Sequence, residues 1–187
     1  MTEQLLQLDK SLFHHINMVW TSPALDALLP WLRNKYIWAP FYLFILAFFI
    51  LNYRWQGVMM ALCLGITILF CDQLSSGIIK PLFQTLRPCN DPMWEGNIRV
   101  LVNCGSGYGF VSSHAANHFG AAMFLGIIFW RKTKFVLPAL LAWAALISYA
   151  QVYVGLHYPF DVAGGAGLGV LIGTGIAFLC RRHGWMD

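Results

Sequence analysis

The chain has 187 residues, of which 58% are hydrophobic and only 11% are charged, and its mean hydropathy is +0.60. A water-soluble domain of this size needs many more charged side chains on its surface, so the composition excludes that class and indicates a polytopic membrane protein. The net charge of +4 is small and its basic residues are scattered, which argues against a protein that binds nucleic acid.

The first 35 residues are expected to lie along the membrane interface. Apolar residues recur there at spacings of three and four, as on one face of an amphipathic helix. That face comprises Leu5, Leu8, Leu12 and Phe13. Ser22 and the proline after it predict a second short helix that ends near Leu32. Asp26 within this helix, and Arg33 and Lys35 after it, argue against a deep membrane span.

Five further segments each approach the roughly 20 apolar residues that a bilayer crossing requires. They cover residues 37–53, 57–79, 115–130, 135–156 and 160–179. Together they predict an all-α transmembrane bundle with five spans, or six if the second short helix also crosses. The whole chain, residues 1–187, is expected to form one membrane-embedded domain with its transmembrane core over residues 37–180.

Basic residues indicate which side of the membrane each loop faces. Counting alternate loops places one basic set on a single side, which the positive-inside rule makes cytoplasmic. The set comprises Arg54, Arg131, Lys132, Lys134, Arg181 and Arg182. The loop between residues 80 and 114 and the turn around His157 then face the outer side together.

Three polar clusters lie on this outer side, at the ends of apolar segments, where ionisable groups are functional candidates. Lys80 and Arg87 offer two cations for a phosphate group, or else they only reach towards lipid head groups. Ser112 and Ser113 precede a long helical pattern, so free backbone N–H groups at its start favour an anion. An ordinary serine cap of a helix would give the same pattern. His114 follows the two serines directly.

His157 and Asp161 form the third cluster. Their spacing of four lets the carboxylate hold one imidazole N–H, which fixes the tautomer and makes the other ring nitrogen a better nucleophile. A polar pair that bridges two helices is the structural alternative. Two histidines beside two cations indicate a site that handles phosphate.

The three clusters together resemble the motifs of the type 2 phosphatidic acid phosphatases, whose membrane members share a helical core with vanadium haloperoxidases and glucose-6-phosphatase. The family pattern begins with Lys, six residues and Arg-Pro, and Lys80 to Pro88 matches it completely. The second motif is Pro-Ser-Gly-His, and residues 111–114 match it at Ser and His only. The third is Ser-Arg, five residues, His, three residues and Asp, which residues 150–161 match except at the opening Ser-Arg.

The resemblance implies a fold, a reaction and a role for each matching residue. His157 is expected to be the nucleophile, Asp161 to orient it, and His114 to protonate the leaving oxygen and then activate water. The expected phosphate-binding residues are Lys80, Arg87, Ser112, Ser113 and Gln151.

Two positions depart from the family pattern. Gln151 replaces an arginine, so one charge-assisted contact worth about 1.5 to 3 kcal/mol is expected to be lost. Ser113 replaces a glycine. Asn117 and His118 follow His114 on the same helical face and are candidate accessory residues for the lost contact.

The implied reaction uses no metal and no other cofactor. A zinc site is the alternative, and its ligands would be His114, His118, His157 and Asp161. We disfavour it because Lys80 and Arg87 would repel a cation.

The expected partner is a phosphorylated lipid in the bilayer, foremost undecaprenyl diphosphate or a phospholipid phosphate such as phosphatidic acid or phosphatidylglycerol phosphate. The family also suggests lipid A 1-phosphate, and the sequence does not choose among these lipids. The expected location is a bacterial inner membrane, with the site on the periplasmic or extracellular side. Cys89 and Cys104 would then lie in an oxidising compartment and are candidates for a disulfide. A lipid transport or scrambling protein, which Asp72 within a span favours, and a phosphate-binding homologue that has lost turnover remain open alternatives.

Overall fold

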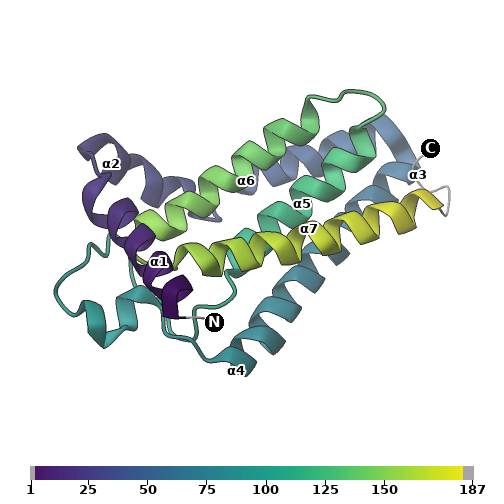
Figure 1. Ribbon diagram of the computed structural model, residues 1–187. Helices are drawn as coiled ribbons and strands as arrows, with labels where there is room; N and C mark the ends of the chain where they lie inside the picture. Colours follow the sequence, from purple (N-terminus) through teal and green to yellow (C-terminus); the bar gives the residue numbers. More distant parts are fainter. Residues whose placement is uncertain (1–2, 183–187) are drawn as a thin grey trace.

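Residues 3–182 are described by a computed structural model, in which this part of the chain forms helices and loops but no strand (Figure 1). The α-helices are α1 (Glu3–His14), α2 (Pro23–Leu32), α3 (Ala39–Asp72), α4 (Lys80–Phe83), α5 (Ser113–Phe129), α6 (Val136–Tyr153) and α7 (Pro159–Arg182). Two π-helical turns, His15–Val19 and Gln73–Ile79, continue α1 and α3. The expected all-α class is confirmed.

The centre of the bundle is α5, which packs along α7 for most of its length (Figure 1). Glycines on α7 allow this close approach. A Cβ atom on Gly169 or Gly173 would lie only 2.3 Å from a backbone carbonyl oxygen of α5, and one on Gly165 would lie 2.3 Å from the carbonyl oxygen of Ser112, which caps α5. Small residues of this kind let two membrane helices bring their backbones together, and they fix how the beginnings of α5 and α7 face each other.

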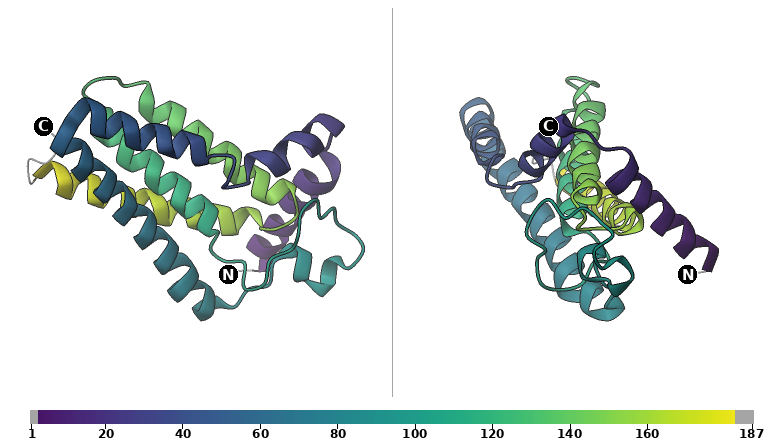
Figure 2. Two further views of the ribbon diagram at one scale, coloured as in Figure 1. Left: turned by 180° about the vertical axis from the view of Figure 1, so that it is seen from behind. Right: turned by 90° about the vertical axis from the view of Figure 1, so that its left-hand side faces the viewer.

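Helix α3 consists of two limbs that meet at Arg54, where φ is 50° and ψ is −121° (Figure 2). Gly57 permits the sharp bend, because a Cβ atom there would lie 1.9 Å from the carbonyl oxygen of Phe49. The two limbs correspond to the expected segments 37–53 and 57–79.

Within residues 3–182, three helical stretches are long and apolar enough to cross a membrane, judged by length and composition. They are Ala39–Phe83, which holds both limbs of α3, and the helices α6 and α7. Helix α5 has 17 residues and is largely buried among its neighbours. The structure thus has helical limbs at all five expected segments, and the number of membrane crossings stays a prediction.

Helix α1 packs on the bundle through only part of the apolar face that the sequence predicts. Leu5 and Leu8 are exposed, whereas Asp9 and Phe13 are buried. The exposed leucines leave the interfacial position of α1 as a prediction. Helix α2 begins where the sequence indicates, since the Ser22 side chain accepts a hydrogen bond from the Leu25 N–H.

Candidate active site

The beginnings of α5 and α7 and the loop after α4 meet at one end of the bundle, and they carry the three polar clusters there. His114 lies within electrostatic range of His157 and Lys80. His157 in turn interacts electrostatically with Arg87 and Lys80. Residues that the sequence separates by up to 77 positions therefore surround one small volume.

Asp161 holds His157 in place from the first turn of α7. One carboxylate oxygen, Oδ2, lies 3.3 Å from Nδ1 of His157 and accepts the backbone N–H of Tyr158 at 3.0 Å. Because Nδ1 faces the carboxylate, the free lone pair of the neutral ring belongs to Nε2. His157 and Asp161 are 3% and 4% exposed. Burial lowers the pKa of His157, and Asp161 partly opposes that shift, so the imidazole is neutral at neutral pH.

Ser112 joins the other histidine to this pair. Its backbone N–H donates to the carbonyl oxygen of Asp161 at 2.8 Å. Its buried side chain caps α5 by accepting the Ala115 N–H at 3.5 Å, which leaves the hydroxyl proton available to a ligand oxygen. The start of α5, with its free N–H groups, is thereby fixed beside His157.

The side chain of Ser113 contacts the π-helical turn after α3. Its Oγ lies 2.9 Å from Oγ of Ser75 and 2.8 Å from Oγ of Ser76. The Ser113 hydroxyl therefore attaches α5 to the turn that follows α3. Only the backbone N–H of Ser113 is left to contact an anion. Ser75 and Ser76 carry no signal in the sequence beyond two adjacent hydroxyls near the end of an apolar segment.

Lys80 and Arg87 bring positive charge to the same volume. The charge of Asp161 acts on both cations. Burial lowers the pKa of Arg87, and its Nε atom is buried without a hydrogen-bond acceptor among residues 3–182. Gly105 of the outer loop lies over the guanidinium, since a Cβ atom there would be 3.4 Å from Nη1. An anion is the natural partner of a buried donor that carries a charge.

Gln151 is fully buried on α6 and has an unexpected partner. Its Oε1 accepts a hydrogen bond of 3.2 Å from Nε of Arg33, the residue that follows α2. Its Nε2 has no acceptor within the described part of the chain. The sequence pattern marked Arg33 only as a residue that disfavours a membrane span.

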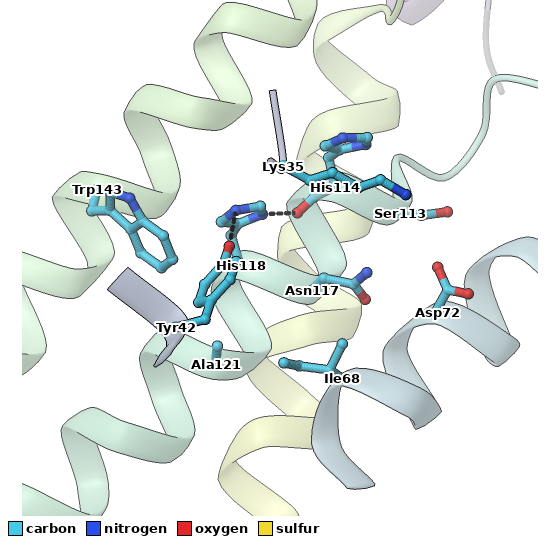
Figure 3. Close-up of a pocket in the computed structure, with 10 residues that line it drawn as sticks. All are labelled: Lys35, Tyr42, Ile68, Asp72, Ser113, His114, Asn117, His118, Ala121 and Trp143. Atoms are coloured by element: carbon cyan, nitrogen blue, oxygen red, sulfur yellow. Dashed lines mark hydrogen bonds between the residues drawn. The ribbon is translucent and has the colours of Figure 1, made fainter. Parts of the chain in front are cut away.

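Behind His114 lies a cavity of about 310 Å³ between α3, α5 and α6 (Figure 3). His118 lines it, with Nδ1 2.8 Å from the His114 carbonyl oxygen and Nε2 3.3 Å from the Tyr42 hydroxyl. Both of its ring nitrogens thus have partners. His118 therefore offers no free donor to replace the phosphate contact that is expected to be lost with the family's arginine at position 151. Asn117 also lines the cavity, and its Oδ1 is buried without a donor among residues 3–182.

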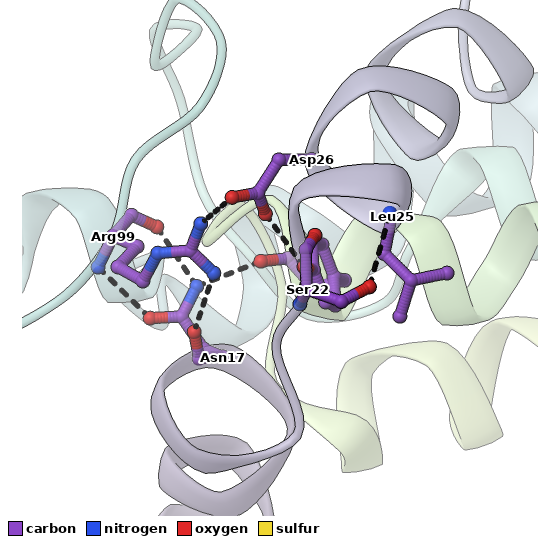
Figure 4. Close-up of polar contacts among 6 residues, drawn as sticks. Asn17, Ser22, Leu25, Asp26 and Arg99 are labelled. Carbon is purple, nitrogen blue, oxygen red and sulfur yellow. Dashed lines mark hydrogen bonds and ion pairs between the residues drawn. The ribbon is translucent and has the colours of Figure 1, made fainter.

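The outer loop is fastened over this end of the bundle. Cys89 and Cys104 form a disulfide, while Cys63, Cys71 and Cys180 are free and buried. Further along the loop, Arg99 pairs with Asp26 of α2, and Asn17 exchanges hydrogen bonds with the Arg99 backbone at 2.8 and 2.9 Å (Figure 4). The salt bridge lowers the pKa of Asp26. The N-terminal helices therefore brace the loop that carries Arg87.

The ligand set of the zinc alternative is not assembled. Within the described range, no three side chains of His, Cys, Asp or Glu come close enough together to hold a metal ion.

Comparison with known proteins assigns the family. A family model described as the PAP2 superfamily matches residues 56–185. The chain belongs to the PAP2 superfamily. The family resemblance of the three motifs is thereby confirmed.

Curated relatives of this PAP2 chain include two named lipid A 4'-phosphatase. The protein from Bacteroides thetaiotaomicron is 35% identical over 188 residues, which cover 97% of this chain and 81% of the relative. The protein from Porphyromonas gingivalis is 29% identical, with 98% and 78% covered. The chain is accordingly a membrane lipid phosphatase of the PAP2 type.

Two crystal structures have the same arrangement of helices. Aquifex aeolicus LpxE superposes with a TM-score of 0.74 at 25% identity, over 96% of this chain and 99% of that one. The transmembrane PAP2 type phosphatidylglycerolphosphate phosphatase from Bacillus subtilis gives a TM-score of 0.75 at 21% identity, over 97% and 88%. The fold is therefore that of the PAP2 membrane phosphatases.

Proposed function

We propose that this protein removes a phosphate group from lipid A, at the 4'-position, by way of a phosphohistidine intermediate on His157. The choice of substrate is supported by the 35% identity to the Bacteroides lipid A 4'-phosphatase along 97% of the chain. Undecaprenyl diphosphate, one of the substrates expected from the sequence, becomes the first comparison substrate. The chemistry follows from the positions of His157 and His114 and the cations around them.

In the first step, Nε2 of His157 attacks phosphorus in line with the sugar oxygen. The bond from phosphorus to that oxygen breaks, and the leaving oxygen takes a proton from His114. Asp161 stabilises the positive charge that the His157 ring acquires. In the second step, His114 takes a proton from water, the water oxygen attacks phosphorus, and the N–P bond breaks to release inorganic phosphate.

Positive groups stabilise the charge on the three non-bridging oxygens in both steps. Lys80 and Arg87 supply two cations, and the backbone N–H of Ser113 lies at the start of α5, where the helix dipole also favours an anion. The Ser112 hydroxyl supplies one more donor. In a site from which water is largely excluded, such fixed donors stabilise a transition state far more than they would in water.

The distribution of charge supports an active site on the outer face of a bacterial inner membrane. Basic residues lie together at the end of the bundle opposite the site. Lys132 donates to the Tyr53 hydroxyl at 3.2 Å, and Arg181 donates to the Ile128 carbonyl at 3.4 Å. Two basic turns and the end of α7 therefore lie together, as the positive-inside rule requires of a cytoplasmic face.

A release assay tests this proposal. The purified protein in detergent micelles is given lipid A with both phosphates, lipid A that carries only the 1-phosphate, undecaprenyl diphosphate and phosphatidic acid, and inorganic phosphate is measured. We expect release from the first substrate and little from the second. Faster release from undecaprenyl diphosphate or phosphatidic acid would overturn the substrate assignment.

The same preparation distinguishes the other functional classes. Rapid quenching in alkali, where phosphohistidine survives, should trap labelled phosphate on the wild-type protein but not on His157→Ala. Tight lipid binding without release from any substrate would instead indicate a degenerate phosphate-binding homologue. Lipid movement between leaflets without release would indicate a transport protein.

A further inference from the structure

The strongest unexplained feature near the site is the guanidinium of Arg33. It is half-buried, its Nε donates to Oε1 of Gln151 at 3.2 Å, and its terminal nitrogens have no hydrogen-bond partner within residues 3–182. No carboxylate pairs with it in the described part of the chain, where the ion pairs are Arg99–Asp26 and His157–Asp161. A partly buried cation without a counter-ion is costly, so its position needs an explanation.

Arg33 lies near another cation and an imidazole of the site. Arg87 acts on it electrostatically, and Arg33 in turn acts on the imidazole of His114. Two guanidinium groups that face one small volume repel each other unless an anion lies between them. A phosphate group in the proposed site would convert this repulsion into two attractions.

Packing fixes Arg33 at this place. Leu29, one helical turn earlier on α2, is 1% exposed and packs against Ala150 and Tyr153 of α6. Figure 1 shows α2 beside the end of α6. Gln151 belongs to this end of α6, since it follows Ala150 and precedes Tyr153 in the sequence. Side chains four apart share one face of a helix, so the docking of Leu29 directs Arg33 towards Gln151. The cation is therefore held in place by the protein itself.

Gln151 occupies the position at which the family motif has arginine, six residues before His157. Its amide oxygen is used by Arg33, and its buried amide nitrogen has no acceptor among the described residues. We propose that Arg33 is a phosphate-binding residue supplied by the segment after α2, and that Gln151 is the positioning residue that holds its guanidinium in place of the arginine that α6 lacks. This inference rests on the proposed function, since it assumes that the site binds a phosphate group.

The central experiment exchanges the two side chains. We compare Arg33→Gln, Gln151→Arg and the double variant, with Lys134→Gln as a control that removes one charge at the opposite end of the bundle. Arg33→Gln should lower kcat/KM by about 10- to 100-fold, the loss expected for one charge-assisted contact. The double variant should recover most of this loss, because an arginine then stands on α6. Lys134→Gln should match the wild type.

A binding measurement separates this inference from the proposed function. Orthovanadate, a phosphate analogue, is titrated into each variant, and both its dissociation constant and the thermal stabilisation that it causes are recorded. Arg33→Gln should weaken vanadate binding about tenfold or more, with the double variant close to the wild type. This readout remains valid even if lipid A proves to be the wrong substrate.

Gln151→Glu tests whether Gln151 only supports the structure. The carboxylate would keep Arg33 in place through an ion pair but would cancel its charge, so thermal stability should be maintained while vanadate affinity falls. A purely structural role predicts unchanged affinity. The inference is overturned if Arg33→Gln retains wild-type kcat/KM and vanadate affinity, or if the double variant is no more active than Arg33→Gln alone.

Discussion

The backbone N–H of Ser112 donates a 2.8 Å hydrogen bond to the carbonyl oxygen of Asp161. This bond joins the residue that caps α5 to the first turn of α7, close to His114 at the start of α5 and to His157 just before α7. The two histidines that we propose as general acid and nucleophile are consequently held near each other by a contact between backbones, which side-chain substitutions leave largely intact. The site can therefore be dissected one side chain at a time.

Asp161→Asn should reduce kcat by about 10²- to 10⁴-fold, the range typical when a histidine loses the carboxylate that orients it. The amide keeps an oxygen for the Tyr158 N–H but no longer favours a proton on Nδ1 of His157. Because Asp161 raises the pKa of His157 and burial lowers it, the variant should also move the acidic limb of the pH–rate profile to lower pH. Phosphate release as a function of pH checks both effects, and a limb that moves upward would contradict the role assigned to Asp161.

Gly169→Ala should lower the thermal stability of the detergent-solubilised protein. The new Cβ atom would lie 2.3 Å from the Ala116 carbonyl oxygen, and overpacking of this kind costs about 1 to 3 kcal/mol. Gly167→Ala is the matched control, since a Cβ atom there meets nothing within 4 Å. Thermal unfolding of the two variants side by side measures the difference, and equal melting temperatures would mean that α5 and α7 do not approach as closely as described.

Replacing Cys89 and Cys104 together by Ser should destabilise the outer loop. The two cysteines are 15 positions apart, and closing a loop of that length stabilises a fold by about 3 kcal/mol in the chain-entropy account. The wild type in reducing agent should unfold at the same temperature as the double variant, whereas the double variant should not respond to reductant. Thiol titration that finds both cysteines free in the oxidised protein would refute the pairing.

Asp9 should make stability depend on pH. Burial raises its pKa from 3.8 to about 6, even though Oδ1 accepts the Phe160 N–H at 2.9 Å. The folded state therefore favours the protonated form of Asp9. The free energy of unfolding that this preference adds is complete below pH 3.8 and is lost as the pH rises through 6. Asp9→Asn keeps an acceptor for Phe160 without a charge. It should melt at a higher temperature than the wild type above pH 6, and a gain that persists at pH 3.5 would exclude titration of Asp9 as the cause.

Local spacing was sufficient to predict most of the helices and the chemical core of the site. The bounds of α2, α6 and α7 follow from apolar length and from residues such as Ser22 that cap a helix. The pairing of His157 with Asp161 follows from a separation of four residues. Such features depend on neighbours in the chain, and a single sequence contains that information.

The face by which α1 packs was harder to predict. Its leucines mark an apolar face that is buried only in part of its length, at Phe13, and Asp9 is buried as well, because the first turn of α7 needs an acceptor for the Phe160 N–H. A polar residue buried for that reason cannot be recognised from periodicity, which counts apolar positions only.

Apolar length and motif spacing are enough to predict a helical membrane protein with two histidines and two cations at one end. The contact of Arg33 with Gln151, 118 residues away, and the bond of Ser113 to the π-helical turn after α3 depend instead on how the helices pack. Apolar spacing specifies a helix and its buried face, but the helices can then pack at several rotations and depths. Which side chains meet across the bundle depends on the close packing of α5 with α7 and of α2 with α6, and no local pattern encodes that choice.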